Sequence, residues 1–469
     1  MTVDTEAAPQ PGTYSVNSGG TGGVWLGLGM ARVALLGIGL LAAILMMTAG
    51  SPPWLALIPI LMALLIAAAR VGGRPALDWV APLIGHRRDA LSGATRWRAV
   101  LPAMPPPGSA ESVRLSLPAE FGRPRVMTCP DDPSIGMIID ATTKTVTVSF
   151  EVCGVDRFPL LDFAERDALI AGWGDALSVL ADTDESLSRL QLIERTLPLA
   201  ADPYPPEPDL DDALDWQFDV VAFATAHETR LAAQWAFGKV DSAALSLIAA
   251  RCQLVCRTLV SARLVARPLS TSEVITEVSS MLTGQPAGAS FAEKPGPLSR
   301  RSEWTHVVLD DRVHRSFAIS GWPSAPVGAA WMSPLLLAAP DAVARTVSLH
   351  LERVVPAAAA RVARSRRAKA TLDQADRARF GMTSSAALDN AQASGIAMDA
   401  ELAAGYRTHR LAGIVTLSGE TIADLDGAGR VLRQAAAVCR IELRPLHGQH
   451  ASALAATAPL CRLRPRGQA

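Results

Sequence analysis

VALLGIGLLAAILMMTAGSPPWLALIPILMALLIAAA, residues 33–69, contains no Asp, Glu, Lys or Arg. The turn formers GSPP at 50–53 divide the stretch into two apolar runs, 33–49 and 54–69. At about 1.5 Å per helical residue each run spans roughly 25 Å, close to the ~30 Å hydrocarbon core of a bilayer. Lipid offers no hydrogen-bonding partner to exposed backbone. Two short apolar runs therefore best satisfy their backbone N–H and C=O groups by forming helices. The stretch therefore predicts a transmembrane helical hairpin.

Two other interpretations of this stretch are less favoured. A pair of buried helices in a soluble core normally carries a polar face, and neither run has one. A cleaved signal peptide is disfavoured because the first run begins late and a second run follows it at once.

Basic residues flank the hairpin on its outer sides, whereas its turn carries no charge. The flanking basic residues are Arg32, Arg70, Arg74, Arg87, Arg88, Arg96 and Arg98. The positive-inside rule then predicts a multi-pass protein of the bacterial inner membrane with both termini in the cytoplasm. The amphipathic run 76–84 is expected near the membrane surface, where the arginines of 87–98 can contact anionic lipid at about 1 kcal/mol per charge.

The rest of the chain is long enough for two soluble domains, because 469 residues exceed one ordinary domain. Strand and helix signals alternate in both, which predicts an α+β fold with ferredoxin-like units. The expected organisation is a disordered segment at 1–32, the hairpin at 33–69, a basic juxtamembrane segment and linker at 70–107, and cytoplasmic domains at 108–283 and 298–469. The Gly- and Pro-rich stretch 284–297 is the expected boundary between the two domains.

Hydrophobic periodicity predicts the elements of the two domains. Strands are expected at 135–140, 145–150, 189–195, 252–264, 314–319, 346–352, 409–417 and 441–446. Helices are expected at 162–180, 215–236, 271–282 and 419–438, with a long Ala- and Arg-rich helical region at 357–405 that breaks at Gly381. Ser418 is the expected N-cap of the helix that follows it.

A short sequence echo links two of the expected strands. Leu192-Ile193-Glu194-Arg195 precedes a proline, and so does Leu351-Glu352-Arg353. A duplicated unit and chance explain this echo about equally well.

The chain shows no motif that would carry catalysis. A P-loop requires GxxxxGK[ST], and Gly238-Lys239 lacks both the upstream Gly and the following Ser or Thr. The stretch VVLDD at 307–311 resembles a metal-holding ATPase strand, but without a phosphate loop it is better explained as an exposed strand end. His447 and His450 have a chelating spacing without an evident third ligand. The six cysteines form no CxxC pair and are expected to be reduced, buried thiols. We therefore predict no enzyme activity, no cofactor and no metal.

A basic run lies on the predicted helix after 357. Its members are Arg361, Arg364, Arg366, Arg367 and Lys369, with no acid among them. The default interpretation is a solvated helix face, and the alternative is a contact with phosphates or with an acidic partner surface. The net charge of −1 gives no global attraction to nucleic acid. Whether this chain contacts DNA directly stays open.

Several short motifs along nearly the whole chain resemble a family of actinobacterial integral membrane proteins encoded on integrative conjugative elements. After the hairpin they are 71–75 (VGGRP) with Trp79, 95–98 (TRWR), 171–174 (AGWG), 192–198 (LIERTLP), 319–323 (ISGWP), 334–337 (PLLL), 446–450 (LHGQH) and 457–460 (TAPL). The family usually has an aromatic residue at the position of His447, which weakens the metal interpretation further.

The resemblance implies a membrane hairpin fused to a body similar to the non-motor N-terminal half of the VirB-type traffic ATPase. It thus implies a non-catalytic scaffold for conjugative DNA transfer by a type IV secretion-like apparatus. The partners implied by the resemblance are a separate ATPase and small membrane subunits. Membrane lipid is expected from the hairpin, and association with a further copy of this chain stays open. The alternatives are an EccE-like membrane component of a type VII secretion system and a membrane-bound enzyme without a recognisable motif.

Overall fold

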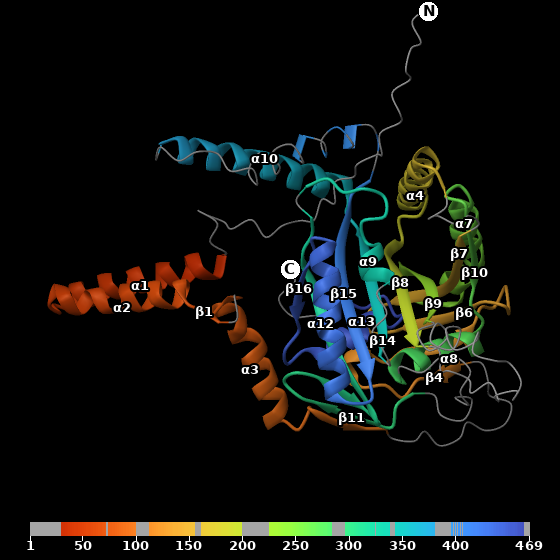
Figure 1. The fold of residues 1–469 in the computed structure, drawn as a ribbon, viewed down its shortest axis with the longest axis horizontal. Helices are drawn as coiled ribbons and strands as arrows, with labels where there is room; N and C mark the ends of the chain where they lie inside the picture. Colours follow the sequence, from red (N-terminus) through yellow and green to blue (C-terminus); the bar gives the residue numbers. More distant parts are fainter. Residues whose placement is uncertain are drawn as a thin grey trace, which may run out of the picture.

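A computed structural model defines the fold and is mixed α+β, as the sequence predicts. Figure 1 shows a large body from which one pair of helices projects. The structure describes residues 30–71, 74–99, 112–154, 161–198, 225–283, 296–323, 325–337, 343–379 and 407–463, with scattered positions between 395 and 405.

The projecting pair consists of α1, Met30–Thr48, and α2, Pro53–Ala68. The two helices lie side by side, and their contact depends on small residues. A Cβ added at Gly39 would lie 2.6 Å from the Cβ of Ala63 and 2.9 Å from the carbonyl oxygen of Pro59. Pro59 lies inside α2, and the facing alanines Ala43 and Ala63 are buried. Close backbone approach through small residues is typical of helices that pack without a hydrophobic driving force.

A short ladder and a third helix connect this pair to the body. Strands β1, Arg70–Val71, and β2, Arg74–Pro75, pair with each other, and helix α3 follows at Leu77–Leu91. Strand β3, Arg96–Arg98, then pairs with β11 at the end of the main sheet. Residues 96–98 of the expected juxtamembrane segment therefore belong to the body, while the expected linker at 102–107 lies outside the described residues.

Within the described residues, the body is built on a 14-stranded antiparallel sheet with the order β3-β11-β12-β13-β15-β14-β8-β9-β7-β6-β5-β4, while β10 pairs with β7 and β16 with β13. Its remaining strands are β4 Ser112–Arg114, β5 Arg125–Thr128, β6 Gly136–Asp140, β7 Thr145–Gly154, β8 Leu187–Pro198, β9 Thr225–Ala236, β10 Leu264–Pro268, β11 Ser299–Ser302, β12 Val307–Leu309, β13 Arg312–Gly321, β14 Ala344–Arg353, β15 His409–Gly419 and β16 Glu442–Pro445. The helices of the body are η1 Ala119–Phe121, α4 Phe163–Thr183, α6 Ser242–Ser246, α7 Ile248–Val260, α8 Thr271–Thr283, α9 Ser333–Leu337, α10 Pro356–Arg379, α12 Ile422–Val438 and α13 His450–Thr457.

The body contains the same topological unit twice. The first unit runs β6-β7-α4-β8-β9-α6-α7-β10-α8, and the second runs β12-β13-α9-β14-α10-β15-α12-β16-α13, so the two orders agree apart from α6 and α10. In the first unit β7 pairs with β6, β9 and β10, and in the second β13 pairs with β12, β15 and β16. The antiparallel pair β8–β14 joins the units, so one sheet runs through both predicted domains.

The sequence echo falls in these equivalent strands, but its residues are not equivalent. Ile193 pairs with Ser348, whose hydroxyl contacts the carbonyl oxygen of Ala456 on one face of the sheet. Leu351 pairs with Leu190, which belongs to the core on the other face. The topology therefore favours a duplicated unit, whereas the echo itself reflects chance.

Three main hydrophobic clusters form the interior. Helices α4 and α7 cover the first unit's outer face, and α9 and α12 cover the second unit's outer face. A further cluster joins Val126 and Ile138, from β5 and β6, to Val307 and Leu309 of β12, with residues of α8 and α13. Strands from both ends of the sheet thus share one core with α8 and α13. An ion pair between Arg300 of β11 and Glu120 of η1 links the same two ends.

Three local predictions are wrong. A helix was expected at 215–236, but the described part of it is β9, which pairs with β7 and β8 on its two sides. Pairing on both edges outweighs the helix propensity of its Ala, Glu and Arg residues. A strand was expected at 252–264, but 248–260 form α7, which buries Ile248, Cys252, Val255 and Leu259 at helical spacing.

The third error concerns the cap of α12. Ser418 lies inside β15, and the N-cap is Thr421, which forms a capping box with Asp424. The Thr421 hydroxyl accepts a hydrogen bond from the Asp424 amide at 3.2 Å, and the Asp424 carboxylate accepts from the Thr421 amide at 3.0 Å. A Thr-x-x-Asp signal was present in the sequence three residues downstream of the expected cap.

The C-terminal segment is held inside the curve of the sheet by Gln191 at the centre of the β8–β14 pair. The Gln191 amide nitrogen donates to Ser348 Oγ at 2.9 Å and to the carbonyl oxygens of Ala456 at 3.0 Å and Ala458 at 2.9 Å. Its amide oxygen accepts from the Cys461 backbone N–H at 2.7 Å. One fully buried side chain therefore ties both units to the segment after α13.

Three histidines on the same face, His314, His350 and His450, are buried and uncharged. His314 Nδ1 lies 2.8 Å from Ser418 Oγ, His350 Nε2 lies 2.8 Å from the Ala456 carbonyl oxygen, and His450 Nδ1 accepts from the Ser316 amide at 3.1 Å. Burial lowers the pKa of each of the three rings to about 3. A proton added to any of them would place an unpaired charge in the interior.

We predict that Gln191→Ala lowers the unfolding free energy by about 2–4 kcal/mol, because a buried group left without its partner costs roughly 1–3 kcal/mol. The Cys461 N–H loses its acceptor, and the Ala458 carbonyl, which also accepts from the Leu460 N–H at 2.7 Å, loses one of its donors. Chemical denaturation of the detergent-solubilised chain measures the loss. Gln253→Ala, at an exposed position of α7, is the matched control and should change little. Equal losses in the two variants would contradict the role given to Gln191.

We predict that the body loses stability as the pH falls from about 6.5 towards 3. The folded pKa of His314, His350 and His450 is about 3, below the ordinary value of 6.5, so the unfolded chain binds more protons across this window. Unfolding free energies at pH 7 and pH 4.5 measure the slope. His350→Gln should flatten the slope, because it removes one of these three rings. An unchanged slope in His350→Gln would contradict this prediction.

Candidate membrane and partner surfaces

The pair α1–α2 exposes large apolar side chains along its length. Ile38 is 63%, Leu45 59%, Trp54 66% and Leu65 66% exposed. By length and composition, 31–48 could cross a membrane, as could 242–260, and α2 is a shorter apolar helix. The second of these candidates is α6–α7, whose buried face belongs to the first unit's core. Exposed contiguous apolar surface of this kind marks a membrane or protein contact.

The flanking arginines of the sequence prediction lie on four elements. Arg32 is on α1, Arg70 and Arg74 are on the β1–β2 ladder, Arg87 and Arg88 are on α3, and Arg96 and Arg98 are on β3. Arg32 is half-buried, whereas Arg70, Arg87, Arg88, Arg96 and Arg98 are exposed. The Arg74 side chain lies outside the described part of the chain.

A stack of aromatic rings fastens α3 to the body. The Trp79 ring of α3 stacks on His447 with centroids 5.4 Å apart, and His447 stacks on Trp304 at 5.8 Å. His86, also on α3, meets the Trp304 ring edge-on at 5.4 Å. Gly448 has φ +69°, and a Cβ there would lie 2.8 Å from the Trp304 ring and 3.1 Å from His86 Cβ, so glycine permits the close approach. We call Trp79, His86, Trp304 and His447 the ring stack.

The ring stack accounts for His447 without a metal. His447 contacts both the Trp79 and the Trp304 ring, whose centroids lie 6.2 Å apart, and the His450 ring is perpendicular to it at 6.1 Å. His450 uses its Nδ1 to accept the Ser316 amide. No group of three His, Cys, Asp or Glu suited to a metal occurs among the residues that the structure describes.

The VVLDD stretch, the Gly238-Lys239 pair and the cysteines, which the sequence offered as possible reactive or binding motifs, all lie in ordinary structural positions. Asp310 has φ +50° in the β12–β13 turn, and its carboxylate accepts from the amides of Leu298 at 2.9 Å and Ser299 at 2.7 Å. Gly238-Lys239 lies in the turn between β9 and α6. All six cysteines are free thiols, and burial raises the pKa of Cys252 and of Cys256.

The predicted basic run begins on the exposed side of α10. Ala359 and Ala363 are buried, whereas Arg361 and Arg364 are exposed. Arg366, Arg367 and Lys369 follow on the same helix, and their side chains lie outside the description. Figure 1 shows α10 extending beyond the body on the side from which α1 and α2 project.

A buried ionic cluster joins β8 and β9 to α8, and it was not predicted from the sequence. Arg195 Nη1 lies 3.4 Å from Glu228 Oε2 and 2.5 Å from Ser280 Oγ, and Arg230 Nε lies 3.3 Å from Glu277 Oε2. Burial raises the pKa of Glu277, and the Arg230 charge opposes this shift. These contacts join β8 and β9 to α8, so the cluster serves packing. Charged residues are usually exposed, so a single sequence does not indicate that these arginines and glutamates are buried as pairs.

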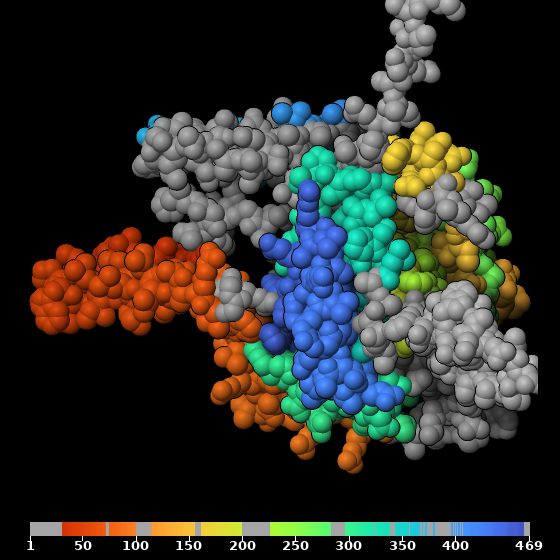
Figure 2. All heavy atoms as spheres, viewed as in Figure 1, coloured from red at the N-terminus to blue at the C-terminus, as the bar shows by residue number. Residues whose placement is uncertain are grey.

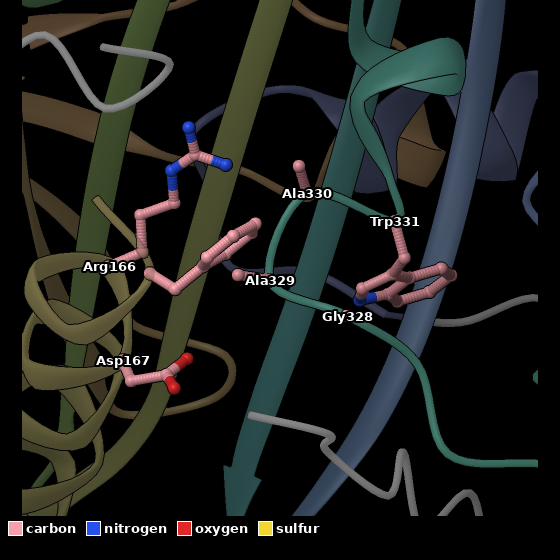
Figure 3. Close-up of a pocket in the computed structure, with 7 residues that line it drawn as sticks. Arg166, Asp167, Gly328, Ala329, Ala330 and Trp331 are labelled. Atoms are coloured by element: carbon pink, nitrogen blue, oxygen red, sulfur yellow. The ribbon is translucent and has the colours of Figure 1, made fainter. Parts of the chain in front are cut away.

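A shallow pocket lies between α4 and the loop before α9, as Figure 3 shows. Phe163, Arg166 and Asp167 face the stretch 328–331, which ends in Trp331, across a cavity of about 270 Å³. The guanidinium of Arg166 lies 5.7 Å from the centre of the Phe163 ring. Sites for small molecules usually offer roughly 300–1,000 Å³, so this cavity is at the lower limit. Its lining residues include no Ser, Cys or His to act as nucleophile or base.

No protein-family model matches the chain, and a comparison with curated proteins finds no match.

Proposed function

We propose that this protein is a membrane-anchored scaffold without catalytic activity, which docks a separate ATPase in a type IV secretion-like apparatus for conjugative DNA transfer. The observation that carries the anchoring is the exposed apolar surface of α1 and α2 beside an otherwise well-packed body. The hairpin crosses the inner membrane twice, and the body and both termini lie in the cytoplasm. The exposed arginines of β1, α3 and β3 support this orientation through the positive-inside rule.

The assignment to conjugative transfer rests on the sequence motifs that resemble the actinobacterial conjugation family. One structural feature agrees with a scaffold. His447, Asp310 and Arg195, whose side chains could in principle serve a reactive site, are used for packing and for internal hydrogen bonds or ion pairs. The body resembles the non-motor half of a traffic ATPase, and its units would be ferredoxin-like repeats. The docking partners are the ATPase and small membrane subunits, and a further copy of this chain is a candidate neighbour.

We expect the intact chain to stay in the membrane fraction after carbonate washing, because a two-pass apolar anchor has no soluble alternative for its exposed side chains. The body should resist protease added to intact cells and be cleaved once the envelope is opened. Release of the full-length chain by carbonate would contradict the anchor, and cleavage of the body from outside would contradict the orientation.

We expect the pair of changes Arg361→Glu and Arg364→Glu to reduce recovery of the ATPase with this chain from native membranes, because reversed charge opposes an acidic partner surface. Arg430→Glu with Arg433→Glu, at exposed positions of α12, is the matched control. Quantitative mass spectrometry of the purified complexes measures recovery. Undiminished recovery would remove the basic run from the docking surface. Small WxG-type helical proteins in place of an ATPase would point to type VII secretion.

A further inference from the structure

Helix α3 has one face on the body and one face that no described part of the chain covers. Trp79, Pro82, His86 and Asp89 are half-buried and Gly85 is buried, at the spacing of one helix face. The opposite face carries exposed apolar side chains: Val80 is 45%, Leu83 44%, Ile84 62% and Leu91 90% exposed. Arg87 and Arg88 are exposed between Ile84 and Leu91.

The body-side contacts prevent α3 from turning its apolar face inwards. Trp79 stacks on His447, and His86 packs on Trp304. The Trp79 indole N–H also donates to the Val71 carbonyl oxygen at 3.1 Å, which links α3 to the ladder before it. After α3, strand β3 is held in the sheet by its pairing with β11. The apolar face of α3 is therefore fixed outwards.

The direction of α3 suits a helix that lies in a membrane surface. In Figure 1, α3 turns sharply away from the direction of α1 and α2 and runs along the side of the body from which they project. Figure 2 shows that pair standing clear of the body. A helix that follows a membrane-crossing pair at such a turn lies along the plane of the bilayer. Apolar side chains with arginines on one face are typical of interfacial helices.

We propose that the outward face of α3 is a lipid-binding surface, which inserts Val80, Leu83, Ile84 and Leu91 between the headgroups and binds anionic phospholipid through Arg87 and Arg88. The proposal rests on the membrane anchoring of the proposed function. The ring stack transmits this contact to the body, so the bilayer sets the orientation of the whole scaffold. The occupant is lipid because the face continues directly from the apolar anchor and combines apolar groups with positive charge.

Spin labels on the full-length chain in nanodiscs test the proposal. Cys153→Ser with Cys256→Ser provides the background, and single labels are placed at Leu45→Cys, Ile84→Cys and Val438→Cys. The measurement compares collisions of each label with oxygen and with the water-soluble complex NiEDDA. At position 84 we expect loss of NiEDDA collisions and high oxygen collisions. Val438, which is 65% exposed on α12, should show the reverse.

The label at position 45 distinguishes failure of the α3 proposal from failure of the membrane anchor itself. If position 45 is in lipid and position 84 is in water, the α3 proposal is overturned and the anchor stands. If both are in water, the anchor itself is overturned, and the α3 proposal with it. Agreement of position 84 with position 45 supports both.

A second measurement tests the charge. Nanodiscs of phosphatidylcholine alone are compared with nanodiscs that also contain phosphatidylglycerol. The anionic lipid should further reduce NiEDDA collisions at position 84. Arg87→Gln with Arg88→Gln should abolish this response, whereas Arg430→Gln with Arg433→Gln on α12 should retain it. A response that survives the loss of Arg87 and Arg88 would overturn their assignment to lipid.

Discussion

The antiparallel pairing of β8 with β14 is the interaction on which the body depends. It joins two units of identical topology into one sheet, with a register from Thr196 opposite Arg345 to Arg189 opposite Glu352. A slip of β8 by one residue would move Gln191 from the inner face to the outer face, away from Ser348. Because both side chains bond to the C-terminal segment, the same register also determines where that segment lies. Sheet pairing, the inner polar contacts and the placement of α13 therefore form one cooperative arrangement.

The position of α8 and α13 follows from the same pairing. Each helix comes last in its unit, and the two share a core with strands from both ends of the sheet. Neither unit alone supplies this core, because Ile138 belongs to the first and Val307 and Leu309 to the second, while Val126 lies on β5 before the first unit. The ion pair of Arg300 with Glu120 crosses the same junction. We infer that the units fold as one body, although the sequence reads as two successive domains.

Local signals predicted much of this fold and missed what distant contacts decide. The alternation of Val146, Val148 and Phe150 predicted β7, and the helical spacing of Trp173, Leu177 and Leu180 predicted α4, whose capping box of Asp162 and Glu165 starts it cleanly. Strand β9 was mistaken for a helix because its Ala, Glu and Arg residues favour helices when its two neighbouring strands are unknown. The ring stack could not be predicted either, because Trp79, Trp304 and His447 come from three stretches that are distant in the sequence.

The connection between anchor and body bears most directly on a scaffold role. A flexible linker would let a tethered body sample many orientations, and a docked partner would gain only raised local concentration. Here the described chain passes from α3 into β3, which is part of the sheet, and the ring stack holds α3 from the side. A body attached in this way keeps one orientation relative to α1 and α2. If α1 and α2 cross the bilayer, a partner docked on the body is aligned with the membrane normal, as machinery that moves a substrate through the membrane requires.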